Sequence, residues 1–151
     1  MADRMDYLHG LDSLLADALS FFSEDFRNRQ ADFIRHNQNP DGGFSGREGT
    51  SDLYYTDFAL RALTVLSADQ TPFASVARFL DTFHPPTSIV EVFNLLNCSR
   101  MLRARSVSGE YVVPDVHRVL DEQRTADGGY SRPGSTATSA YNTFLGTLCL
   151  Q

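Results

Sequence analysis

The side chains best suited to chemistry lie in the segment 47–58 and in a similar segment near the C-terminus. Arg47 stands in the loop sequence GGFSGRE, and a loop arginine near helix N-termini suits the recognition of phosphate. Aromatic side chains near the starts of predicted helices can line an apolar cavity and stabilise cationic intermediates. These aromatic residues are Tyr54, Tyr55, Phe58, Phe93, Tyr141 and Phe144.

The same residues also have ordinary structural interpretations. An arginine in a polar loop can simply be solvated, and aromatic side chains on helices usually belong to the core. We expect the core role for most of the aromatic residues. The candidate substrate-binding set is therefore a hypothesis, and it comprises Arg47, Asp52, Tyr54, Tyr55, Phe58, Tyr141 and Phe144.

Helical periodicity dominates the chain and predicts the elements that position these residues. Apolar residues recur at helical spacing and predict seven helices and no convincing strand. The predicted helices span 7–22, 24–38, 53–68, 72–84, 89–105, 114–125 and 138–151, and GEYVVP (109–114) is expected to be a connector. Ser23 and Asp52 are predicted N-caps, as is either Thr87 or Ser88.

Two loops of similar sequence indicate an internal repeat. Asp41-Gly42-Gly43-Phe44 recurs as Asp127-Gly128-Gly129-Tyr130, which is 86 positions further on, and Gln38 and Gln123 precede the two copies. The match of Tyr55 to Tyr141 and of Phe58 to Phe144 has the same offset, which predicts a register without gaps. The repeats lie near 26–68 and 112–151, with a degenerate copy near 72–105. Each unit is expected to be a helical hairpin that stacks on its neighbours.

The repeated loop residues have a structural explanation. Glycine can cap the carbonyls at a helix C-terminus, and aspartate can accept hydrogen bonds from backbone N–H groups in the turn. The glutamine is expected to bridge to a neighbouring repeat, and the aromatic residue to pack under the loop. We expect this structural role for Gln38, Asp41, Gly42, Gly43, Phe44, Gln123, Asp127, Gly128, Gly129 and Tyr130.

The sequence QNPDGGF followed by SDLYYTDFALRAL resembles the repeat shared by protein prenyltransferase β subunits and squalene/oxidosqualene cyclases. The resemblance covers residues from about 26 to 151, with its specific motifs in the two loops. It implies an all-α fold, in which helical hairpins form part of an α/α toroid around an apolar cavity for an isoprenoid. Arg47 stands where related prenyltransferases carry an arginine that contacts the isoprenoid diphosphate.

The catalytic groups that the resemblance implies are not visible in this chain. The zinc motif Asp-x-Tyr-His-Thr resembles the segment Asp52–Thr56, but Tyr55 stands in place of the histidine, and phenol is a poor zinc ligand. The acidic DxDD run of the cyclases has no counterpart either. We therefore expect no metal site or other cofactor in this chain, with zinc bound only if its ligands lie outside it, and we assign no catalytic residue.

Composition excludes several other classes of function. The chain has 151 residues, of which 42% are hydrophobic, and 13 basic against 19 acidic residues give a net charge of −6. This balance argues against nucleic acid as a partner, because phosphate backbones bind clustered basic charge. No stretch has the length of a membrane span, and no signal peptide is visible, so a cytoplasmic location is expected. Cys98 and Cys149 are expected to be buried thiols.

Two hypotheses of function follow from the sequence. The first is part of an isoprenoid-processing protein that resembles the prenyltransferase and terpene cyclase group and binds a prenyl lipid or prenyl diphosphate. The second is a non-catalytic helical-repeat module that binds a partner on its concave side. The chain has fewer hairpins than the resemblance implies for a closed toroid and ends within an apolar helix. We expect it to be a single domain (1–151) that is an N-terminal fragment of a longer toroid, a truncated gene product, or an arc completed by another copy. Its exposed C-terminal helix face is expected to promote self-association.

Overall fold

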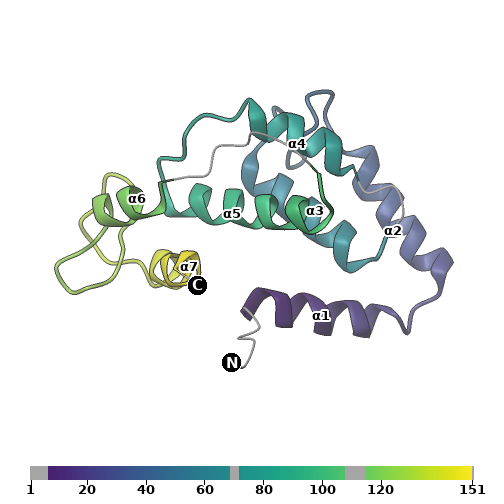
Figure 1. Ribbon diagram of the computed structural model, residues 1–151, viewed down its shortest axis with the longest axis horizontal. Coiled ribbons are helices and arrows are strands. Elements are labelled where there is room, and N and C mark those ends of the chain that lie inside the picture. Colours follow the sequence, from purple (N-terminus) through teal and green to yellow (C-terminus); the bar gives the residue numbers. More distant parts are fainter. Residues whose placement is uncertain (1–6, 69–71, 108–114, 151) are drawn as a thin grey trace.

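The computed structural model describes residues 7–68, 72–107 and 115–150, which form seven α-helices and no β-strand (Figure 1). The helices are α1 (Tyr7–Leu19), α2 (Glu24–His36), α3 (Leu53–Val65), α4 (Phe73–Asp81), α5 (Ile89–Ala104), α6 (Val116–Glu122) and α7 (Ala140–Cys149). The prediction of an all-α protein is confirmed. The connector predicted over 109–114 and the helix start predicted at Pro114 lie outside the described residues.

Side-chain caps fix where the helices begin. Ser23 accepts a hydrogen bond from the Phe26 N–H, and Asp52 accepts from the first N–H groups of α3, so both predicted caps are confirmed. For α5 the cap is Ser88, whose hydroxyl accepts from the Glu91 N–H. The carboxylate of Glu91 in turn accepts from the N–H of Thr87 at 2.7 Å. This reciprocal pairing satisfies backbone donors that a helix start leaves free.

The helices α3, α5 and α7 are neighbours in space, and α5 lies between the other two (Figure 1). The helices α2, α4 and α6 pack against the row formed by α3, α5 and α7. Helix α2 contacts α3, and both α4 and α6 contact α5. Successive hairpins of the chain therefore stack side by side. Helix α1 packs against α3 and runs below α5 in the view of Figure 1.

Two apolar clusters hold the hairpins together. The larger cluster joins α2, α3, α4 and α5, and its fully buried members include Leu60, Leu63, Val76 and Leu102. The smaller cluster joins the start of α5 to α6, α7 and the second repeated loop. Its buried members are Ile89, Val92, Val119, Leu120, Tyr130 and Leu145. Because the clusters span different hairpins, each hairpin buries its apolar face only against a neighbour.

The first repeated loop ties the end of α2 to the start of α3 and to α4. The carboxylate of Asp41 accepts hydrogen bonds from the Gly43 N–H at 3.0 Å and from the Ser51 hydroxyl at 2.6 Å. The side-chain amide of Gln38 donates to the Ser75 hydroxyl of α4 at 2.9 Å. The loop is thus a hydrogen-bonded joint between two neighbouring hairpins.

The second loop repeats this arrangement but points to a different neighbour. Asp127 accepts hydrogen bonds from the hydroxyls of Thr125 at 2.6 Å and Thr138 at 2.5 Å, and these bonds hold the pKa of its carboxyl below the usual value. Gln123 donates to the Thr87 carbonyl at 3.0 Å and accepts from the Ile89 N–H at 3.4 Å. It therefore bridges back to the start of α5.

The two repeats differ by one residue, so the prediction of a register without gaps is wrong for the helices. The loop glycines are 86 positions apart, but the equivalent N-caps, Asp52 and Ser139, are 87 apart. The Phe44 N–H donates to the Thr56 hydroxyl, whereas the Tyr130 N–H donates to that of Thr143, also 87 positions further on. One extra residue in the second loop causes this shift. By helix position Tyr141 therefore corresponds to Tyr54, not to Tyr55.

Candidate functional site

An apolar groove runs between α1 and α3. It has a volume of about 460 Å³, which lies within the range of small-molecule sites. Its walls come from the facing sides of the two helices and comprise Leu11, Leu15, Ala18, Leu19, Phe22, Phe58, Arg61, Ala62, Val65 and Leu66. The spacing of the α1 residues at three and four positions explains why they share one wall.

One ion pair fastens the two walls of the groove. The guanidinium Nε of Arg61 on α3 donates to the Asp12 carboxylate of α1 at 2.6 Å, and both side chains are largely shielded from water. Arg61 is the one charged residue among the groove residues. Because its charge is balanced by Asp12, the groove presents a nearly neutral, apolar interior.

The predicted aromatic residues of α3 form a half-exposed cluster at this groove, and Phe58 itself lines the groove. Tyr54 lies 5.4 Å from Tyr55 and 4.8 Å from Phe58 between ring centroids. Their exposed fractions are 39% for Tyr54, 47% for Tyr55 and 51% for Phe58, so none of the three is a core residue. The opposite side of α3, with Leu60 and Leu63, supplies the buried residues of this helix.

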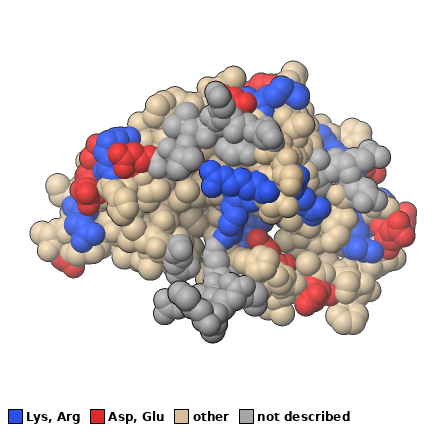
Figure 2. Space-filling view, viewed as in Figure 1, with Lys and Arg blue, Asp and Glu red and all other residues tan. Residues whose placement is uncertain are grey.

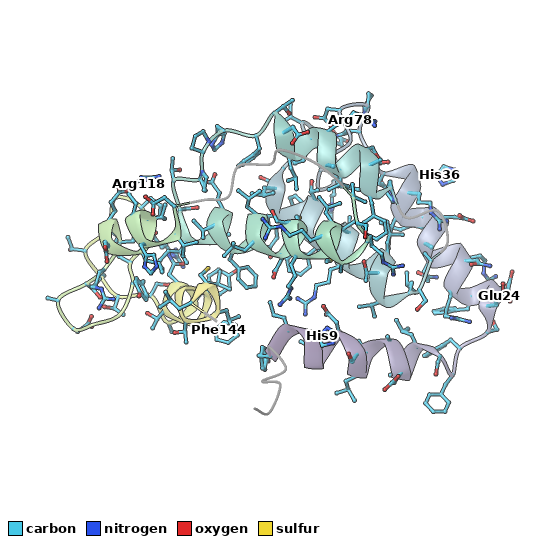
Figure 3. All side chains as sticks on the ribbon, viewed as in Figure 1. His9, Glu24, His36, Arg78, Arg118 and Phe144 are labelled. Carbon is cyan, nitrogen blue, oxygen red and sulfur yellow. The ribbon has the colours of Figure 1, made fainter. Side chains whose placement is uncertain are left out.

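The predicted aromatic residues of α7 lie near the cluster on α3. Phe144 projects toward the N-terminal end of α1, where its ring meets that of Tyr7 edge to face at 6.1 Å (Figure 3). Burial is the main cause of a raised pKa of the Tyr141 phenol, and the nearby Tyr54 and Asp57 raise this pKa further. Tyr141 and Phe144 are both about half exposed, so the expectation that most of the predicted aromatic residues belong to the core is wrong. Aromatic side chains from two hairpins and from α1 thus lie on the same side of the molecule.

Arg47 is exposed in a loop, whereas Asp52 is hydrogen-bonded to the start of a helix. Arg47 is exposed in the loop before α3, and its neighbour Gly46 lies so close to the Tyr55 ring that an added Cβ would be 3.0 Å from it. The carboxylate of Asp52 accepts hydrogen bonds from the N–H groups of Tyr54 and Tyr55, at 2.8 and 3.3 Å. Asp52 therefore supports the aromatic cluster through the start of α3.

A buried carboxyl, Asp57, lies between α3 and α5, and the sequence analysis missed it. It is only 2% exposed and accepts hydrogen bonds from the Asn97 amide at 3.3 Å and the Cys98 thiol at 3.9 Å. Burial raises its pKa to about 7, although Asn97 and the charge of Arg61 act in the opposite direction. Such a carboxyl can give up or take a proton near neutral pH. The detectable sign in the sequence was an acidic residue within the apolar stripe of a helix.

The structure also defines the surroundings of the two cysteines and of the side chains that could bind a metal. Cys98 is fully buried and Cys149 half-buried, and burial raises the pKa of both thiols, that of Cys149 to about 12. Within residues 7–68, 72–107 and 115–150, no three side chains of the histidine, cysteine, aspartate or glutamate type come together in a way that would hold a metal ion.

Comparison with protein-family models, curated proteins and solved structures finds no match to this chain. None of the helices in the described part of the chain is both long and apolar enough to cross a bilayer.

Proposed function

We propose that this chain binds a prenyl lipid in the groove between α1 and α3, as part of a protein of the prenyltransferase or terpene cyclase type. The observation that carries the proposal is the apolar groove itself. The charge of Arg61 in its wall is balanced by Asp12, and half-exposed aromatic rings cluster at the groove. A prenyl chain is elongated and apolar, and its double bonds contact aromatic faces favourably. The stacked hairpins are consistent with an arc of an α/α toroid.

The groove favours a flexible lipid over a polar metabolite. Apart from Arg61, whose guanidinium donates to Asp12, every side chain that lines it is apolar. A polar ligand would leave its own hydrogen-bonding groups unpaired there, which costs free energy. A prenyl chain has no hydrogen bonds to water that it could lose, and it gains from the burial of its apolar surface.

A substitution that fills the groove tests the proposal. Ala18 is exposed and lines the groove, so Ala18→Phe is expected to occupy it without disturbing the core. We expect farnesol to bind the wild-type protein, and Ala18→Phe to weaken this binding about tenfold or more, which corresponds to about 1.4 kcal/mol. Isothermal titration calorimetry measures the change.

The matched control is Ala74→Phe, an equally exposed position on α4 that does not line the groove. It is expected to bind farnesol as the wild-type protein does. Failure of the wild-type protein to bind farnesol, or equal binding by Ala18→Phe, would show that the groove is not a prenyl site.

A second function, a non-catalytic module that binds a partner protein, is favoured by a separate observation. Phe21 is 91% exposed and Phe33 is 70% exposed, on the segment after α1 and on α2. An exposed aromatic side chain can anchor a protein–protein contact when a pocket of the partner buries it. Because neither residue lines the groove, Phe21→Ser and Phe33→Ser are expected to leave farnesol binding unchanged under either function.

A further inference from the structure

Helix α1 is only lightly attached to the rest of the fold. Of its 13 residues only Leu8 is buried, whereas the equally long α3 buries six. Its main helical neighbour is α3, while α3 itself also packs against α2 and α5. A helix of this length is marginally stable by itself in water, so its position depends on the contact with α3.

Open space lies along both sides of the contact between α1 and α3. The apolar groove faces one side of α1, and a second cavity of about 300 Å³ faces the other side. The α1 residues that line this second cavity are His9, Asp12, Ser13 and Ala16. Val65 of α3 lines both spaces, so the contact that separates them is narrow. Well-packed interiors have few voids of this size, so α1 does not interlock with α3 as the core helices do with one another.

Two side-chain contacts and a short connection hold α1 in place. Near its middle, the Asp12 carboxylate accepts a hydrogen bond from the Arg61 Nε at 2.6 Å, and at its N-terminal end the Tyr7 ring meets that of Phe144 edge to face. Charged side chains of both signs lie where α1 meets the helices above it in the view of Figure 2. At the other end, residues 20–23 connect α1 to α2, and all four are exposed. A connection without buried side chains can take up the backbone rotation of a hinge.

From these observations we infer that α1 is a hinged lid on the groove, which opens about residues 20–23 while α2 to α7 stay folded. The role of the lid rests on the proposed function, because the groove is the site to which it regulates access. Opening breaks the ion pair between Asp12 and Arg61 and exposes Leu8, but no buried member of either core cluster belongs to α1. One wall of the groove consists of α1 side chains, so movement of α1 admits an elongated apolar chain and its return covers that chain.

Hydrogen exchange of the full chain without ligand, followed by mass spectrometry, tests the opening itself. We expect the amides of α1 to exchange about tenfold or more faster than those of α5. Low concentrations of urea are expected to change the α1 rates little, because opening of the lid exposes little surface. If α1 and α5 exchange at the same rate and with the same urea dependence, α1 opens only when the whole protein unfolds, and the lid is overturned.

Variants at the ion pair and in the core separate the lid from global unfolding. Asp12→Ala is expected to speed the exchange of α1 about tenfold, because it removes a charge-assisted hydrogen bond. The matched control Asp17→Ala, at an exposed position of the same helix, is expected to leave the exchange unchanged. Val76→Ala is expected to speed the exchange of α5 but not of α1, because the core that contains Val76 stays intact when the lid opens. Equal acceleration of both helices by Val76→Ala, or no acceleration of α1 by Asp12→Ala, contradicts a lid fastened by this ion pair.

Farnesol connects the lid to the proposed function. Because farnesol is expected to bind only under the closed lid, about ten times its dissociation constant is expected to slow the exchange of α1 about tenfold. Local exchange of α6, which packs against α5 and does not line the groove, is expected to stay unchanged. If calorimetry shows saturation with farnesol while α1 exchanges as before, α1 does not cover the ligand and the lid is overturned. If farnesol does not bind at all, the proposed function fails, whereas the opening of α1 is decided by the exchange without ligand.

Discussion

Raising the pH from about 5 to about 8 is expected to lower the free energy of unfolding by about 3 kcal/mol through Asp57 alone. Burial raises the pKa of this carboxyl from 3.8 to about 7 in the folded protein. At pH 5 the unfolded chain has already lost this proton and the folded chain still holds it. Folding therefore takes up a proton, and stability falls as the pH rises until the folded carboxyl ionises near pH 7.

The variant Asp57→Asn is expected to remove most of this loss, because an amide does not titrate. Urea unfolding at several pH values, followed by circular dichroism, measures the difference. Asp81→Asn, at an exposed position of α4, is the control and is expected to keep the wild-type pH dependence. If Asp57→Asn loses as much stability between pH 5 and 8 as the wild-type protein does, Asp57 does not titrate near neutral pH.

The same carboxyl lies close to the residues of the candidate site. It lies between α3 and α5. The pKa of the nearby Tyr141 phenol is raised mainly by burial, and the charges of Tyr54 and Asp57 add to this effect, so a protonatable group lies near the aromatic side chains. Arg61 lies near both Asp57 and the groove. Its charge lowers the pKa of Asp57, and its guanidinium forms an ion pair with Asp12 at the groove.

Replacing Gly42 by alanine is expected to destabilise the protein by about 2–4 kcal/mol. Gly42 has a φ of 95°, which L side chains rarely adopt, and an added Cβ would lie 2.0 Å from the Ser75 carbonyl oxygen of α4. The methyl group would push apart two hairpins that Gln38 joins through Ser75. Thermal or chemical unfolding of Gly42→Ala measures the effect.

The repeat supplies a matched control at the equivalent loop position. Gly128 also has a positive φ, 87°, but an added Cβ there would meet nothing within 4 Å. Gly128→Ala is expected to cost only about 1 kcal/mol, the cost of the backbone conformation itself. Equal destabilisation by the two variants would contradict a close approach of α4 to the first loop.

Much of the local structure was determined by the sequence itself. The seven helices follow from apolar residues at helical spacing, and the caps Ser23 and Asp52 follow from their side chains at helix starts. The paired Asp-Gly-Gly loops follow in the same way, since Gly42 and Gly128 both need a positive φ. These features depend on residues a few positions apart, which is why a single sequence reveals them.

Only the tertiary structure decided which residues meet across the hairpins. The sequence match favours the wrong register for α7, because an offset of 86 pairs Phe58 with Phe144, whereas the structural offset of 87 pairs Asp57 with Phe144. The burial of Asp57 depends on Asn97 and Cys98, some 40 positions away, and its raised pKa follows from that burial. The groove likewise exists only because α1 packs against α3, a contact set by the summed burial of side chains from distant segments.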